Sequence, residues 1–197
     1  MKMTFKHPNL KETAEKNVKH LVYIATRPGV DKSLTEKDLQ KELEKEEVDG
    51  PFIAGAQRSH GLFGPDGAEN LEEMKKEIGA AKGFVWRCIV SLKEEDAKEL
   101  GYLKKDKWED LLRNKVPEMA REMNIPIENL RWVGAVHMER GHPHAHLMIW
   151  EREPSIRLGV ISKNHIVNMR KSLTDEVFSE ERQNLLNEKN IMRDLIR

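Results

Sequence analysis

Apolar residues recur along the chain with two different spacings, and each spacing predicts a type of element. Within residues 11–27, Ala14, Val18, Leu21 and Ala25 lie three or four residues apart, which predicts a helix with one buried face. That helix must end before Pro28. The same periodicity predicts further helices over 71–82, 94–100, 106–123, 163–178 and 180–197. Apolar runs bounded by polar residues predict strands over 83–92, 130–138 and 143–150.

This order of elements predicts an α+β fold in which an antiparallel β-sheet has helices packed on it. Residues 1–10 are expected to add an edge strand, and Pro117 is a possible kink in its helix. We expect one main domain over 1–162, with a helical segment over 163–197 packed on it or extending from it. Two stretches have weak periodicity: the charges of 31–49 indicate a solvated helix or arm, and the glycines and prolines of 51–67 indicate turns.

Composition limits how the protein can bind nucleic acid and excludes some classes of protein. The 197 residues carry a formal net charge of zero with 35% charged residues, so a nucleic-acid site would have to be a local basic patch. The single cysteine, Cys88, lies in an apolar run, which predicts a buried thiol and excludes an internal disulfide. No apolar stretch reaches membrane-spanning length and the first residues do not resemble a signal peptide, so we expect a cytoplasmic protein.

Four of the eight histidines fall within ten residues, His137 to His146. If 143–150 is a strand, His144 and His146 point to the same side, and a short connection over 139–142 folds His137 back beside them. Three imidazoles with open coordination positions are typical of a catalytic metal site. Spacing alone leaves His142 as an alternative ligand.

The pattern of His137, Glu139, Pro143, His144 and His146 resembles the three-histidine motif of the HUH endonucleases. That superfamily includes conjugative relaxases and rolling-circle replication initiators. The resemblance implies that His137, His144 and His146 hold a divalent metal, Mn²⁺ or Mg²⁺, against the scissile phosphate of single-stranded DNA while a tyrosine attacks it. Imidazole ligands also suit other transition metals, which stay open as alternatives. It also implies that Glu139 either orients a ligand histidine or acts as the base, whereas an exposed loop glutamate is the alternative.

The chain contains two tyrosines, Tyr23 and Tyr102, and both precede the histidines. On a helix, Tyr23 adjoins Lys16, Lys19, His20 and Arg27, and positive charge favours a phenolate. Relaxases carry their nucleophile before the histidines, and the segments 21–29 and 60–64 resemble the MobP-type and, more closely, the MobL-like relaxases. The resemblance therefore implies Tyr23 as the nucleophile. Tyr102, in an expected turn between helices, is the weaker candidate, and Tyr23 could instead merely cap the core.

A relaxase nicks one strand at the origin of transfer of a plasmid or conjugative element and keeps a 5′-phosphotyrosyl bond. The expected partners are single-stranded DNA with an adjacent hairpin, accessory relaxosome proteins and a coupling protein. Relaxases usually continue into further domains, so the resemblance leaves open that these residues begin a longer protein. The residues expected to contact DNA are Lys16, Lys19, Arg27, Arg58, His60, Arg140 and Arg152.

Two alternative functions would use the same histidines. A metal-dependent nuclease would use activated water and would not need Tyr23. A noncatalytic DNA-binding module would use the metal only to stabilise the hairpin, and metal would then raise its melting temperature without any cleavage.

Overall fold

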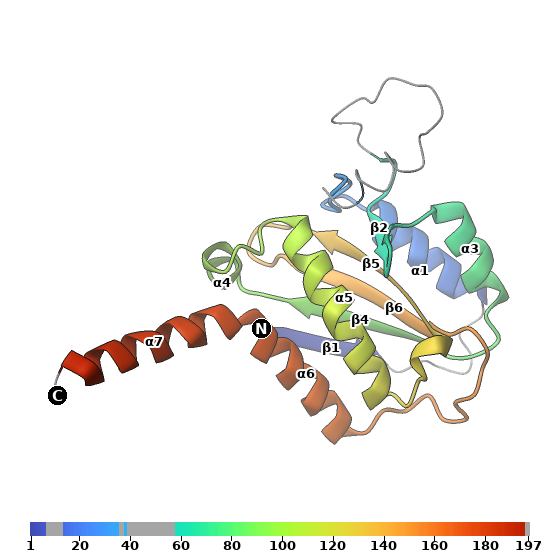
Figure 1. Cartoon of the computed structure of the whole chain (residues 1–197). Coiled ribbons are helices and arrows are strands. Elements are labelled where there is room, and N and C mark those ends of the chain that lie inside the picture. Colours follow the sequence, from blue (N-terminus) through green and yellow to red (C-terminus); the bar gives the residue numbers. More distant parts are fainter. Residues whose placement is uncertain (7–13, 36–37, 39–57, 196–197) are drawn as a thin grey trace, which may run out of the picture.

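The computed structural model describes residues 1–6, 14–35, 38 and 58–195, and six strands in this part form one antiparallel sheet (Figure 1). The order across the sheet is β1-β4-β6-β5-β2-β3. The central pair, β5 and β6, is joined by a short hairpin, so the histidine segment lies in the middle of the sheet. The strands are β1 (Lys2–Lys6), β2 (Leu62–Gly64), β3 (Gly67–Ala68), β4 (Val85–Ser91), β5 (Leu130–His137) and β6 (His144–Glu151).

Helices cover both faces of this sheet. Alternate residues of a strand point to opposite faces, and the buried side chains accordingly fall into two clusters. One cluster joins Val133 and Met148 to α1 and α3, and the other joins Trp132 and Leu147 to α5 and α6. The helices are α1 (Ala14–Thr26), α3 (Leu71–Ala80), α4 (Glu94–Glu99), α5 (Lys105–Glu122), α6 (Lys163–Val177) and α7 (Ser179–Leu195), with a 3₁₀ turn at Ile127–Asn129.

The predicted α+β class is confirmed, and the predicted helices and strands agree with those observed to within a few residues. The edge strand expected within 1–10 is β1, and α5 runs through Pro117 as one continuous helix. Cys88 is buried, and burial raises the pKa of its thiol to about 12. Trp132 and Trp150, expected in the core, are both buried.

The stretch 51–67 was predicted as turns, and this is wrong at its end. Leu62–Gly64 forms β2, which pairs with β5 and turns back into β3. The turn at Pro65 and Asp66, with Gly67 after it, explains the error, because its proline and glycine signals hide a three-residue strand that pairing with β5 and β3 stabilises. The predictions for 39–49 and 51–57 lie outside the described residues.

The two C-terminal helices, α6 and α7, differ in how they pack against the rest of the protein. α6 packs on α5 and buries Met169, Leu173 and Val177 in the larger cluster. α7 runs away from the body of the protein (Figure 1) and leaves Leu185, Leu186, Ile191 and Met192 exposed. The division of the chain at residue 162 stays a prediction. No helix in the described part of the chain is long and apolar enough to cross a membrane.

β2 reaches the core through one close contact across the sheet. A Cβ built on Gly134 of β5 would lie 2.7 Å from Phe63 Cζ, and the Phe63 ring also packs edge-on against Trp132. Phe63 is fully buried, so its ring has no free space into which it can move. Gly134 therefore lets β2 bring an aromatic ring onto the central strand.

We expect Gly134→Ala to lower the free energy of unfolding by about 1–3 kcal/mol, because the added methyl group overpacks Phe63. Urea denaturation measures this value. Phe63→Leu should recover part of the loss in the double variant, so the two effects should not add. Gly79→Ala, at an exposed helical position, is the matched control and should stabilise the protein by up to about 1 kcal/mol. Equal losses at both glycines would contradict this account of Gly134.

Candidate metal centre and active site

The β5–β6 register brings the three predicted histidines together. His137 pairs directly with His144, and His146 pairs with Ala135 two residues further along, so all three side chains lie on the α1 face of the sheet. The ring centroids are 5.2 Å apart for His137 and His144, 4.9 Å for His137 and His146, and 5.0 Å for His144 and His146. One potential ligand atom from each ring lies within 4.8 Å of the other two.

Backbone carbonyls hold two of these rings by the nitrogen that is not needed for a ligand. His137 Nε2 lies 2.9 Å from the Ile24 carbonyl of α1, and His144 Nδ1 lies 2.8 Å from the His142 carbonyl. Both nitrogens must therefore carry the proton, since a carbonyl only accepts. The Ile24 carbonyl is free for this contact because its donor in a continuing helix would be residue 28, and Pro28 has no N–H.

The opposite nitrogens fit a metal ion. His137 Nδ1 and His146 Nε2 are buried and have no hydrogen-bond partner, which is costly for a polar atom unless a ligand satisfies it. Burial lowers the pKa of His137 to about 4, and burial together with the neighbouring histidines lowers the pKa of His146 to about 3. Both rings are thus neutral at pH 7 and offer a lone pair, as a divalent cation requires.

His142 does not belong to this cluster. Its side chain is exposed in the hairpin loop, and it contributes its backbone carbonyl to His144. Glu139 is also exposed, and its carboxylate accepts a hydrogen bond from Arg27, which lowers the pKa of Glu139. The motif led us to expect that Glu139 would orient a ligand histidine. In the structure, backbone carbonyls orient His137 and His144 instead.

Tyr23 stands beside the cluster on α1. The residue is 51% exposed, its ring stacks on His20 at 6.2 Å between centroids, and the Arg27 guanidinium lies 5.3 Å from the ring centroid. His20 in turn meets His146 edge-on at 6.3 Å. Sequence reasoning treated His20 only as a cationic neighbour of Tyr23. Its spacing of three residues already placed it beside Tyr23 on the helix, but only the structure shows that it also meets His146.

The turn after α1 fixes this helix to the strand that carries His137. Met138 N donates to Gly29 O at 2.9 Å, Asp31 N donates to Val136 O at 2.8 Å, and Val30 forms a β-bridge with His137. Together with the bond from His137 to Ile24, these contacts set the distance between Tyr23 and the histidines.

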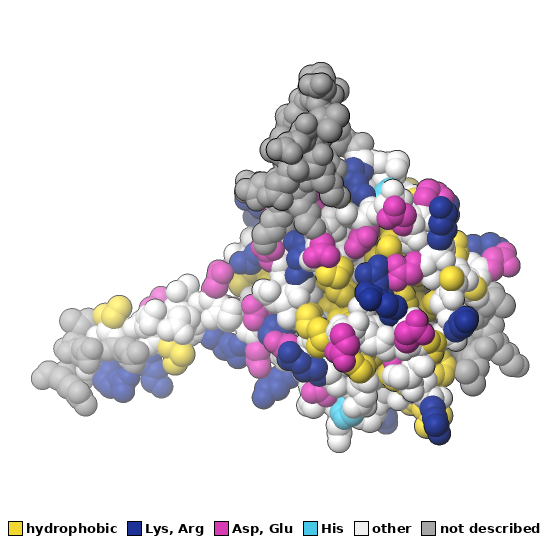
Figure 2. Space-filling model, turned by 45° about the vertical axis from the view of Figure 1, so that its right-hand side comes forward, with side chains coloured by type: hydrophobic (Ala, Val, Ile, Leu, Met, Phe, Trp, Pro, Cys, Tyr) yellow, Lys and Arg dark blue, Asp and Glu magenta, His cyan; other side chains and the backbone are white. Residues whose placement is uncertain are grey.

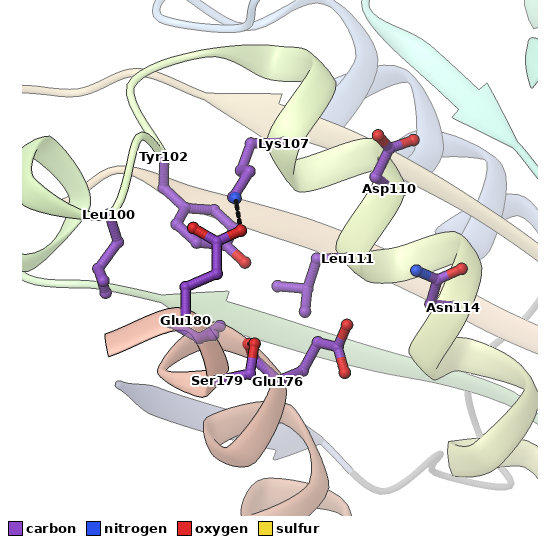
Figure 3. Close-up of a pocket in the computed structure, with 10 residues that line it drawn as sticks. Leu100, Tyr102, Lys107, Asp110, Leu111, Asn114, Glu176, Ser179 and Glu180 are labelled. Atoms are coloured by element: carbon purple, nitrogen blue, oxygen red, sulfur yellow. Dashed lines mark hydrogen bonds and ion pairs between the residues drawn. The ribbon is translucent and has the colours of Figure 1, made fainter. Parts of the chain in front are cut away.

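Tyr102 lies on the opposite face of the sheet, in the cluster of α5 and α6 (Figure 3). Its ring is 3% exposed and packs against Trp108, and burial with the charges of Glu176 and Glu180 raises its pKa to about 12. The adjoining pocket holds the ion pair of Lys107 and Glu180. Buried and held as a neutral phenol, with two carboxylates nearby, Tyr102 is poorly suited to attack a phosphate.

The predicted DNA contacts have different surroundings. Lys16, Lys19 and Arg140 are exposed, and Lys19 forms an ion pair with Glu15. Arg152 follows the far end of β6, roughly 20 Å along the strand from His146, so the structure does not bring it to the histidines. On the face shown in Figure 2, basic and acidic side chains are interspersed, as a net charge of zero suggests.

Arg58 and His60 are engaged within their own segment. Arg58 donates to the carbonyls of Leu62 and Glu69, and His60 Nδ1 accepts from Leu62 N at 3.3 Å. Burial and the nearby Arg58 lower the pKa of His60 to about 4. Both side chains support the start of β2, and their contact with DNA stays a prediction.

We expect Mn²⁺ to raise the melting temperature by about 5–10 °C when it is present at 100-fold its Kd, because it binds only the folded cluster. Differential scanning fluorimetry with a chelator control measures the shift. His146→Ala should abolish the shift, and His142→Ala, which removes an exposed imidazole from the adjoining loop, should preserve it. A shift lost in His142→Ala and kept in His146→Ala would place the metal elsewhere.

Comparison with known proteins identifies the family. No curated protein and no solved structure gave a significant match. Residues 10–197, however, match the family model of the MobL relaxases, which is in line with the MobL-like resemblance of the motifs and with the antiparallel α+β fold. Since the match covers nearly the whole chain, the protein belongs to the MobL relaxase family, a family of DNA relaxases.

Proposed function

We propose that this relaxase nicks single-stranded DNA at an origin of transfer by transesterification, with Tyr23 as the nucleophile. The observation that carries the proposal is the row of rings from Tyr23 through His20 to His146, which joins an exposed phenol to a buried cluster of three imidazoles. A DNA phosphate that lies between Tyr23 and the histidines would meet the nucleophile on one side. On the other side it would meet the positive charge of a metal ion held by the histidines.

In the proposed reaction, Tyr23 Oη forms a bond to phosphorus while the bond between phosphorus and the 3′ oxygen breaks. The products are a 5′-phosphotyrosyl bond and a 3′-hydroxyl, which takes up a proton. The phenolic proton leaves to water or to the ionised Glu139 carboxylate. Because one ester replaces another, the reverse attack by the 3′-hydroxyl can reseal the strand.

The metal is proposed to be held by His137, His144 and His146. When bound, Mn²⁺ or Mg²⁺ would neutralise charge on the nonbridging oxygens of the scissile phosphate. The protein's own contribution is to keep His137 and His146 neutral by burial and to fix the tautomers of His137 and His144 through carbonyls. Both effects keep lone pairs directed at one point before DNA arrives.

DNA binding is assigned to exposed cations on both sides of the site, with Lys16 and Lys19 on α1 and Arg140 in the hairpin loop. With no overall positive charge, the interaction with phosphates would be local and would weaken with added salt. Accessory relaxosome proteins and a coupling protein are proposed partners, which would supply the strand separation that single-stranded substrate requires.

We expect Tyr23→Phe to abolish nicking of a supercoiled plasmid that carries the DNA flanking this gene, with Mn²⁺ bound as in the wild-type protein. The variant lacks only the attacking oxygen. Conversion to open circles is followed on gels after detergent, with and without protease, beside a chelator control. The wild-type protein should remain on the 5′ end until protease is added.

Tyr102→Phe is the matched control and should nick at close to the wild-type rate, because Tyr102 lies on the other face of the sheet. Nicking that persists in Tyr23→Phe without a covalent adduct would support a nuclease that uses activated water. A metal-induced rise in melting temperature with no cleavage of any DNA tested would support the noncatalytic module instead.

A further inference from the structure

We infer that Arg27 is a positioning residue that holds the Tyr23 hydroxyl for attack, and that Glu139 fixes the Arg27 guanidinium for this task. The inference rests on the proposed function, because it concerns the same nucleophile. It replaces the expectation that Arg27 only contacts the DNA backbone, and it gives Glu139 a role that acts through Arg27.

The geometry places one guanidinium between two acceptors. Arg27 Nη1 donates to Tyr23 Oη at 2.8 Å, and Arg27 Nη2 donates to Glu139 Oε1. Tyr23 and Arg27 are four residues apart on the last turn of α1 and the residue that follows it, whereas Glu139 comes from the β5–β6 hairpin 112 residues later. The fork therefore links the nucleophile's helix to the hairpin that carries the histidines.

Arg27 is more shielded from solvent than an arginine that only contacts DNA phosphates would be. Its side chain is 19% exposed, against 43% for Glu139 and 51% for Tyr23 as a residue. Two of its donor groups are already bound, and its Cζ lies 5.3 Å from the Tyr23 ring centroid. With His20 stacked on the same ring, Tyr23 is held from two sides although half of its surface is exposed.

The turn that follows α1 is shaped to bring Glu139 to Arg27. Gly29 has a positive φ of 89°, and a Cβ at this position would lie 3.1 Å from Glu139 Cγ. A side chain at residue 29 would therefore push the carboxylate away from Arg27. The bond from Met138 N to Gly29 O fixes the backbone of the hairpin beside the same turn.

This arrangement affects the chemistry directly. A guanidinium that donates to the phenolic oxygen stabilises the negative charge that oxygen carries when it attacks, and again when it leaves during resealing. Arginine carries the two donors in a rigid plane, so it can serve Tyr23 and Glu139 at once. Lysine is a point charge on a flexible stem and cannot hold the same pair of bonds in a fixed geometry.

The test compares Arg27→Gln and Arg27→Lys with wild-type protein in single-turnover nicking of an oligonucleotide that spans the nick site mapped on the plasmid. Binding of the same oligonucleotide is measured by anisotropy over a range of salt concentrations. We expect Arg27→Gln to lower the rate of adduct formation at saturating DNA about 10- to 100-fold, with little change in Kd. Arg27→Lys should recover only part of that rate.

Arg182→Gln is the matched control, because Arg182 also forms an ion pair, with Asp175, but on α7 away from the site. It should leave both rate and Kd unchanged. A second measurement guards against misfolding: guanidinium ion added to Arg27→Ala should restore part of the rate, whereas sodium at the same ionic strength should not. A misfolded variant would show no such rescue and would also lose its metal-induced rise in melting temperature.

The outcomes separate the inference from the proposed function. If wild-type protein forms the Tyr23 adduct and Arg27→Gln forms it equally fast, the positioning role is overturned and the proposed function stands. If Arg27→Gln mainly raises Kd and makes it less dependent on salt by about one counterion, Arg27 is a phosphate contact instead. If wild-type protein forms no adduct at Tyr23, the proposed function fails and the inference fails with it.

Discussion

The hydrogen bond between His137 Nε2 and the Ile24 carbonyl connects the two halves of the candidate active site. It depends on Pro28, which ends α1 and leaves that carbonyl without a helical donor. The bond fixes the tautomer of a buried histidine and, at the same time, holds the helix that carries Tyr23 against the strand that carries the cluster. The backbone bonds from the following turn to β5 reinforce this single contact.

Burying histidine nitrogens without hydrogen-bond partners is unfavourable, and the packing of the sheet has to offset this cost. Lone pairs such as those of His137 Nδ1 and His146 Nε2 are rarely left in a protein interior without a partner. Here they lie at one end of the longest paired stretch of the sheet, β5 with β6, and both residues are buried. The central position in the sheet thus keeps His137 and His146 buried and neutral, so that both can take a cation.

The two faces of the sheet have different roles: one carries the larger apolar core and the other carries the candidate active site. On its α5 face the side chains form the larger apolar cluster, which contains Tyr102 and extends to α6. On its α1 face a smaller apolar cluster ends at the histidines, beside the exposed ring of Tyr23. This division explains why two tyrosines of the same chain have opposite environments, one buried in the apolar core and one exposed and held by a guanidinium.

Much of the fold could be predicted from periodicity, because long amphipathic helices and long apolar strands such as β4 and β5 bury a face that is visible in the pattern. β2 could not, since three residues carry no readable period and become a strand by pairing with β5 and β3. The prediction of the His137, His144 and His146 cluster drew on alternation along one strand and a short hairpin. Exclusion of His142 required the structure, because spacing fits it equally well.

The sequence by itself determined the class of fold, the family resemblance, the histidine cluster as a metal candidate and the order of tyrosine before histidines. Each follows from short-range spacing or from residue identity, both of which are present in the chain before it folds. Only the tertiary structure decided that Tyr102 faces away, that Arg152 is remote, and that Arg27 lies between Tyr23 and Glu139. Those relations join residues up to 112 positions apart, and strand register and helix packing set them.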